Sequence, residues 1–88
     1  MNFEMLSIKV LGPGCMNCVM VERAAREAVV DLGVEAKIEK VTNYFEILKY
    51  RGVATPGLVI NEKLVCAGRV PGTIEVKAWL TNALAQES

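Results

Sequence analysis

The sequence predicts an α/β fold in which one mixed, four-stranded sheet is flanked by three helices in the order β-α-β-α-β-β-α. Strand-like and helix-like periodicities alternate along its first half, and two short apolar strands then follow each other closely. The alternation of strands and helices requires crossover helices and parallel strands. The two short strands that follow each other closely should pair antiparallel and form one edge of the sheet. Because no internal repeat, linker or low-complexity segment interrupts this pattern, we expect residues 1–88 to form a single domain.

The spacing of apolar residues changes from that of a strand to that of a helix near the start of the chain. Apolar and polar residues alternate over residues 6–10, and Gly12-Pro13-Gly14 ends this strand. From Cys18 onward, apolar residues recur at helical spacing as far as Leu32. Gly33 is placed to end the helix, since glycine adopts the left-handed conformation common at that position.

The remaining elements are shorter. We expect a strand over residues 36–41 and a helix over 43–50 that is capped by the asparagine at its start. Apolar strands over 58–60 and 64–67 are separated by three residues, which suits an antiparallel hairpin. Thr73 can cap a last helix. Its expected buried side consists of Ile74, Val76, Trp79, Leu80, Ala83 and Leu84.

The composition excludes several classes of function. Ten Lys and Arg balance ten Asp and Glu, so we expect neither nucleic acid nor a membrane as a partner. No segment approaches the roughly 18 apolar residues of a membrane-spanning helix, and the start lacks the pattern of a secretory signal. We therefore expect a cytoplasmic protein. We also expect a monomer. Thiols are kept reduced in the cytoplasm, so three cysteines without any histidine indicate chemistry or metal binding before a structural disulfide.

Two cysteines with two residues between them stand at the start of the first helix. This spacing brings the side chains close enough to form a reversible disulfide. At a helix amino terminus, unpaired N–H groups and the helix dipole favour thiolate over thiol, so Cys15 is the candidate nucleophile. Cys18 shares a helical stripe with Val21 and Ala25, so we expect it to be partly buried and to act as the resolving cysteine.

Two segments carry a resemblance to a known family. Gly12-Pro13-Gly14-Cys15-Met16-Asn17-Cys18 and Ala54-Thr55-Pro56-Gly57-Leu58-Val59-Ile60-Asn61 resemble the small redox-active disulfide branch of the thioredoxin-like proteins, which includes compact glutaredoxin-like members. The resemblance runs over nearly the whole chain. It implies a thioredoxin-like fold and a thiol-disulfide oxidoreductase of cell redox homeostasis. Its redox-active disulfide is then Cys15–Cys18, without another cofactor, and its partners are a protein disulfide or dithiol and a reductase or low-molecular-weight thiol.

The same resemblance assigns a second half of the site. It implies that Pro56 is a cis-proline facing the cysteine pair and that the backbone of Thr55 docks an extended substrate. Gly14, Met16 and Asn17 surround the nucleophile and are expected to contact the substrate. The glycines on either side of the proline at position 13 allow a partner's backbone to come close, or they simply form a strand-to-helix turn.

The sequence also departs from typical thioredoxins. Met16-Asn17 replaces Gly-Pro between the cysteines, and no Trp precedes them, which leaves the reduction potential and the reductase open. Lys9 stands about where typical thioredoxins bury an acidic residue. It either points inward and favours nearby thiolates or is exposed. Cys66 lies in an apolar strand, as a core residue or as a third thiol if it reaches the pair.

A soft-metal carrier is the strongest alternative. The loop from Gly14 to Cys18 also resembles that of heavy-metal-associated domains, which bind Cu(I) through two thiolates, here Cys15 and Cys18. Those domains run β-α-β-β-α-β, whereas Thr55-Pro56 before a strand and a closing helix around Trp79 fit the thioredoxin order. A zinc site would need about four ligands, which three cysteines without histidine could supply only together with carboxylates or a second chain. A third alternative is an interaction module whose cysteines are merely core residues.

Overall fold

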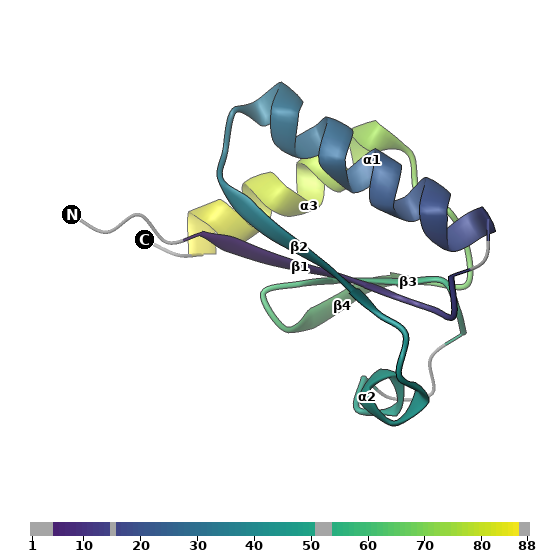
Figure 1. Ribbon diagram of the computed structural model, residues 1–88. Helices are drawn as coiled ribbons and strands as arrows, with labels where there is room; N and C mark the ends of the chain where they lie inside the picture. The colour runs from purple at the N-terminus through teal and green to yellow at the C-terminus, as the bar shows by residue number, and fades with distance from the viewer. Residues whose placement is uncertain (1–4, 15, 51–53, 87–88) are drawn as a thin grey trace.

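The computed structural model describes residues 5–14, 16–50 and 54–86. Two helices lie together on one face of a four-stranded sheet and a third, shorter helix lies on the other face (Figure 1). In chain order, the elements are β1 (Leu6–Leu11), α1 (Met16–Leu32), β2 (Ala36–Val41), α2 (Tyr44–Leu48), β3 (Gly57–Ile60), β4 (Lys63–Ala67) and α3 (Thr73–Gln86). This confirms the predicted order and the predicted mixed sheet.

The strand order positions the ends of two strands side by side. The sheet runs β2-β1-β3-β4, with β1 and β2 parallel and the other neighbours antiparallel. Leu11, the last residue of β1, pairs with Gly57, the first residue of β3. The chain that leaves β1 therefore starts next to the chain that enters β3, so Gly12 and Pro56 are brought to the same edge of the sheet.

The helix α1 packs an apolar stripe onto the sheet. Val21, Ala25 and Ala28 are fully buried and join the main core that this helix forms with α3, β1 and β3. The helix begins at Met16, two residues before the first apolar position of the stripe. It ends as predicted at Gly33, whose φ is +66° and whose N–H donates to the Val29 carbonyl at 3.0 Å.

The buried face of α3 is narrower than the sequence suggested. Val76 and Leu80 are fully buried, and Trp79 is partly buried, but Ile74 is 81% exposed and Leu84 is 38% exposed. At about 100° per residue, Ile74 lies about 200° around the helix from Val76. The prediction that Ile74 and Leu84 belong to the buried side is therefore wrong.

The start of α3 is also stabilised differently from the prediction. Thr73 is the first helical residue, and its hydroxyl donates to Glu27 of α1 at 3.0 Å. The Glu75 carboxylate instead accepts from the backbone N–H of Gly72 at 3.0 Å and binds the Arg69 guanidinium at 2.9 Å. A carboxylate in the first turn suits the positive end of the helix dipole.

The hairpin between β3 and β4 is tighter than predicted. Only Asn61 and Glu62 connect the strands, with φ values of +50° and +68°, whereas Lys63 belongs to β4. Such a two-residue turn fits the twist of paired strands. Asn61 also ties the hairpin to β1, because its side chain accepts from the Ser7 N–H at 3.0 Å and its own N–H donates to the Ser7 carbonyl at 2.8 Å.

The short helix α2 covers the second face of the sheet. As predicted, Asn43 caps it, and the Asn43 side chain accepts from two backbone N–H groups of the first turn at 2.8 and 3.4 Å. The helix ends at Leu48, two residues earlier than predicted. Ile47 forms a small second core with Leu11 and Val59.

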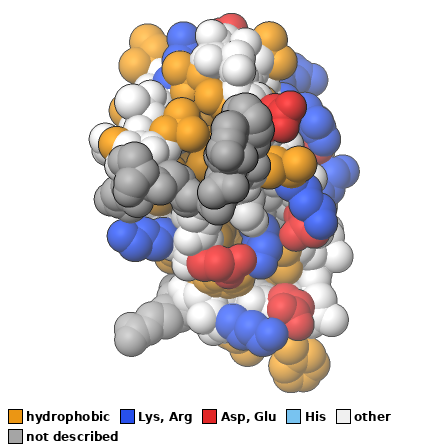
Figure 2. Space-filling model, turned by 90° about the vertical axis from the view of Figure 1, so that its left-hand side faces the viewer, with side chains coloured by type: hydrophobic (Ala, Val, Ile, Leu, Met, Phe, Trp, Pro, Cys, Tyr) orange, Lys and Arg blue, Asp and Glu red, His pale blue; other side chains and the backbone are white. Residues whose placement is uncertain are grey.

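The surface carries charges of both signs. Figure 2 shows Lys and Arg side chains interspersed with Asp and Glu side chains in the lower part of the view, with hydrophobic side chains gathered above them. Within residues 5–14, 16–50 and 54–86, no helix has both the length and the apolar character needed to cross a membrane.

Candidate functional site

The candidate site lies at the sheet edge where β1 ends, α1 begins and β3 begins (Figure 1). Cys15, the predicted nucleophile, lies outside the described residues. Cys18 is in the first turn of α1 and is only 6% exposed. This burial agrees with the position of Cys18 on the apolar stripe of the helix.

Gly12 lies between Cys18 and Thr55. A Cβ atom added to Gly12 would overlap the Sγ atom of Cys18 and would lie 3.8 Å from the Cβ atom of Thr55. The cysteine sulfur therefore packs directly on the glycine backbone, and Thr55 reaches the same point from the start of β3. Gly14 differs, because its φ is +95° and an added Cβ would meet nothing within 4 Å. Packing against Cys18 thus explains why position 12 is a glycine, whereas the space beside Gly14 is open.

Thr55 and Pro56 are held in place by the end of β4. Thr55 is exposed and Pro56 is buried, and the peptide bond between them is cis. The Pro56 carbonyl accepts from the Gly68 N–H at 2.8 Å. Gly68 has a φ of +82°, and a Cβ added to it would lie only 3.2 Å from the Cβ of Ala54. Glycine at position 68 therefore lets the two segments approach closely.

The residues between and after the cysteines form an exposed apolar surface. Met16 is 72% exposed, and Asn17 is also exposed. Val19 and Met20, which the sequence analysis did not single out, are 41% and 46% exposed. They follow Met16 by three and four residues, so helical spacing alone could have placed them on one surface with it.

A small cavity of about 60 Å³ lies behind Cys18 and is lined in part by Glu22 and Lys40. The Glu22 side chain is 15% exposed and binds Arg26 at 2.8 Å and Lys40 at 3.5 Å. The Arg26 guanidinium, followed by Lys40, lowers the pKa of Glu22. Glu22 and Arg26 are four residues apart on α1, a spacing at which opposite charges pair on a helix. The sequence pattern did not single out Glu22 as a site residue. Its position four residues after Cys18 was the available signal.

Lys9 is not part of the site. Its Nζ donates to Glu62 at 2.8 Å and to the Tyr50 hydroxyl at 3.2 Å, on the face of the sheet that α2 covers. Cys18 belongs to α1, which lies on the other face (Figure 1). The bond to Glu62, followed by that to Tyr50, raises the pKa of Lys9. With 23% of its side chain exposed, Lys9 neither shares the face of Cys18 nor projects into open solvent.

Cys66 packs in the main core. It is 8% exposed, and its Sγ donates to the Arg69 carbonyl at 3.9 Å. Among the residues that the structure describes, no three His, Cys, Asp or Glu side chains come close enough to hold a metal ion together.

Comparisons with known proteins agree with this architecture. The sequence matches the family model of the thioredoxin domain over residues 6–81. A thioredoxin of Methanothermobacter thermautotrophicus is 42% identical over 77 residues, which are 88% of this chain and 100% of the relative. A thioredoxin of Methanocaldococcus jannaschii is 35% identical over 80 residues, covering 91% of this chain and 92% of the relative.

A solved structure shows the same fold. The crystal structure of the germline-specific thioredoxin Deadhead from Drosophila melanogaster matches with a TM-score of 0.53 and 17% identity, over 93% of this chain and 80% of that one. The sheet, its helices and the two archaeal relatives together define a thioredoxin-like redox protein. The chain belongs to the thioredoxin domain family.

Proposed function

We propose that the protein is a thiol-disulfide oxidoreductase in which Cys15 is the nucleophile and Cys18 is the resolving thiol. The Cys15 thiolate attacks one sulfur of a substrate disulfide, and the other substrate sulfur leaves as a thiolate. The Cys18 thiolate then attacks the Cys15 sulfur, which releases the second substrate thiol and forms the Cys15–Cys18 disulfide. Two electrons pass to the substrate, and a reductase or a low-molecular-weight thiol returns the protein to the dithiol. The reverse sequence oxidises a dithiol.

The burial of Cys18 against Gly12 is the observation that carries this proposal. A thiol that is 6% exposed is poorly accessible to a disulfide in solution. Cys18 lies in the first turn of α1, only three positions after Cys15 in the sequence. The mixed disulfide would form at Cys15. The packing therefore suits a thiol that reacts second and within the molecule.

The charges behind Cys18 support the second step. Cys18 must lose its proton before it attacks, and a nearby cation favours a thiolate whereas a carboxylate disfavours it. Lys40 and Glu22 line the same small cavity as Cys18. The cavity is large enough for a water molecule, and the two charged groups give that water polar partners. We expect these two residues to set the thiolate content of Cys18 in opposite directions.

The exposed surface next to the pair supports a protein substrate. Met16, Val19 and Met20 offer an adaptable apolar contact without a charged group. Thr55, an exposed residue two positions before β3, lies close to Gly12 as well. An extended peptide with apolar side chains around its disulfide fits between these two borders better than a strongly charged one.

The proposal is tested by equilibrating the protein with dithiothreitol or glutathione redox buffers and counting free thiols. We expect a reversible two-electron transition between about −120 and −270 mV that is absent in Cys15→Ser and Cys18→Ser. Cys66→Ala serves as the matched control and should keep the transition, because Cys66 packs in the core. If the pair forms no reversible disulfide and instead binds one Cu(I) tightly, a metal carrier replaces this proposal.

A further inference from the structure

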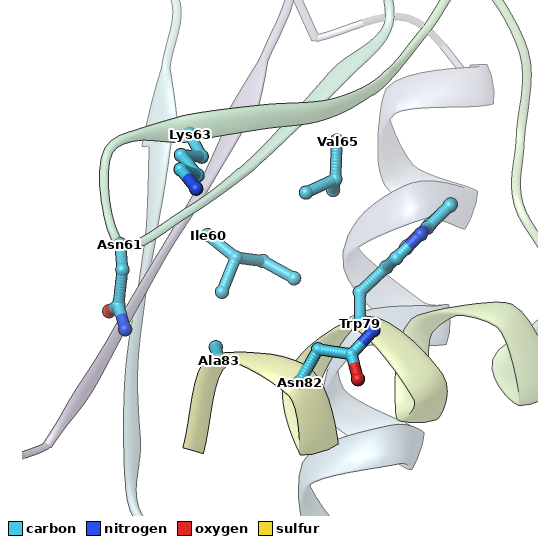
Figure 3. A pocket seen from close by; sticks show the side chains of 7 residues that line it. All are labelled: Ile60, Asn61, Lys63, Val65, Trp79, Asn82 and Ala83. Carbon is cyan, nitrogen blue, oxygen red and sulfur yellow. The ribbon is translucent and has the colours of Figure 1, made fainter. Parts of the chain in front are cut away.

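We propose that a groove between the β3–β4 hairpin and α3 binds a small organic anion with a planar apolar body. The groove has a volume of about 340 Å³, which falls in the range of small-ligand sites. Lys63 and Val65 of β4 form one wall, and Trp79 and Ala83 of α3 form the other (Figure 3). Its floor includes Ile60, the last residue of β3, so it lies at the end of that strand remote from Cys18.

The groove exists because the apolar face of α3 ends in a small residue. Val76 and Leu80 fill the space between helix and sheet and are fully buried. Ala83 follows on the same face, but its single methyl group leaves space between α3 and the hairpin. Ile60 is only 3% exposed and belongs to the main core, so the groove adjoins the core at this residue. An apolar body that occupies it would extend the core.

The polar residues of the groove favour an anion. Lys63 makes no ion pair with any described residue, and no Asp or Glu lines the groove. The Asn82 side chain lies on the α3 side of the groove and adds an amide that can donate a hydrogen bond (Figure 3). The carbonyl groups of the last turn of α3 point along the helix axis rather than across it. One cation, Lys63, and two side-chain amides, Asn61 and Asn82, thus border the apolar space.

Trp79 selects the shape of the ligand. Its indole is partly buried against the main core and forms a flat wall of the groove. Flat aromatic walls pack best on planar or aromatic groups. A ligand with an aryl ring and one carboxylate therefore matches both the tryptophan wall and Lys63.

This site does not depend on the proposed redox chemistry. None of the groove residues lines the cavity behind Cys18 or contacts Gly12. We expect a Cys15→Ser and Cys18→Ser double variant to bind the ligand as the unmodified protein does. Failure of the disulfide-exchange test would thus leave the ligand-binding proposal standing. Failure of the ligand-binding test would likewise leave the disulfide-exchange proposal standing.

Trp79 is the only tryptophan of the chain, so its fluorescence reports on the groove directly. The probe is 3-phenylpropionate, with 3-phenylpropanamide as the uncharged analogue and acetate as the analogue without a ring. We expect a saturable change of Trp79 emission with 3-phenylpropionate and at least about fivefold weaker binding of both analogues. Lys63→Gln should weaken 3-phenylpropionate binding about fivefold. Lys37→Gln, which changes an exposed lysine on β2, should have no effect.

A variant that fills the groove completes the test. Ala83→Leu should abolish binding, and its thermal unfolding shows whether the fold is retained. If Ala83→Leu fails to fold, Lys63→Gln still decides the matter, because this side chain is exposed, makes no ion pair with a described residue and lies outside the main core. The proposal is overturned if 3-phenylpropionate gives no saturable change at millimolar concentration. It is equally overturned if the amide analogue binds as well, or if Lys63→Gln binds unchanged.

Discussion

The contact between Gly12 and the Cys18 sulfur predicts an unusual coupling between two substitutions. In Gly12→Ala, the new methyl group would overlap the Sγ of Cys18 and must displace the cysteine or the start of α1. In a Cys18→Ala background the sulfur is gone, and the nearest remaining atom is the Cβ at position 18, at 3.6 Å. That distance is an ordinary van der Waals contact. Gly12→Ala should therefore be far less damaging when Cys18 is absent.

The expected magnitude follows from the packing. Forcing one extra methyl group into a filled site costs about 1–3 kcal/mol, so we expect Gly12→Ala to lower the free energy of unfolding by about 2 kcal/mol. For a chain of this length that corresponds to a fall of roughly 10 °C in Tm. In the Cys18→Ala background this packing cost should disappear, so the same substitution should cost about 2 kcal/mol less there than in the presence of Cys18. Any backbone cost of alanine at position 12 is common to both backgrounds and cancels in the cycle.

The assay is urea unfolding of the four proteins, followed by circular dichroism under fully reducing conditions, so that no disulfide contributes. Gly14→Ala is the positional control. It adds a methyl group in open space at a φ of +95°, so its cost arises from backbone strain and should be the same with and without Cys18. An equal cost of Gly12→Ala in both backgrounds would refute the direct packing of the sulfur on this glycine.

Two further predictions concern charged groups. In a Cys15→Ser background at fixed neutral pH, Glu22→Gln should speed alkylation of Cys18 by iodoacetamide about threefold, and Lys40→Met should slow it by a similar factor, because each removes one of two opposite charges beside the same cavity. Equal directions for the two variants would contradict this. The Arg69 guanidinium, helped by a backbone N–H, lowers the pKa of Glu75 from 4.5 to about 2. A lowered folded-state pKa stabilises the fold above the unfolded value, so this contribution is present above about pH 4.5 and is lost as the pH falls toward 2. In a Tm series over that window, Glu75→Gln should show a flatter decline than the unmodified protein, and identical slopes would rule the prediction out.

The order of the elements could be predicted because periodicity and punctuation agreed along the chain. The run from Cys18 to Leu32 had one consistent apolar stripe, and Gly33 marked its end. The face of α3 was harder, since seven of the eleven residues from Ile74 to Leu84 are apolar and they are spread around the helix, so the pattern does not say which side meets the sheet. Only the packing of Val76 and Leu80 resolves it.

The site could be predicted where neighbours in sequence form it. The burial of Cys18 followed from its place on the helix. The approach of Thr55 to Gly12 depends on the pairing of two strands far apart in the chain, and only the resemblance to thioredoxin-like proteins indicated it. The environment of Lys9 could not be predicted in this way, because its partners are Glu62 in the β3–β4 turn and Tyr50 after α2, and no local pattern connects these segments to β1.

The proposed roles of Cys15 as nucleophile and Cys18 as resolving thiol are tested most directly by trapping the mixed disulfide. Each single-serine variant is mixed with a disulfide-bonded protein such as insulin, and the product is identified by intact-mass spectrometry and peptide mapping. We expect Cys18→Ser to accumulate a mixed disulfide at Cys15, and Cys15→Ser to react at least about tenfold more slowly, because Cys18 is buried. The unmodified protein should end as the Cys15–Cys18 disulfide with the substrate reduced. Faster reaction at Cys18 than at Cys15, or no disulfide between the two in the unmodified protein, would contradict the proposed mechanism.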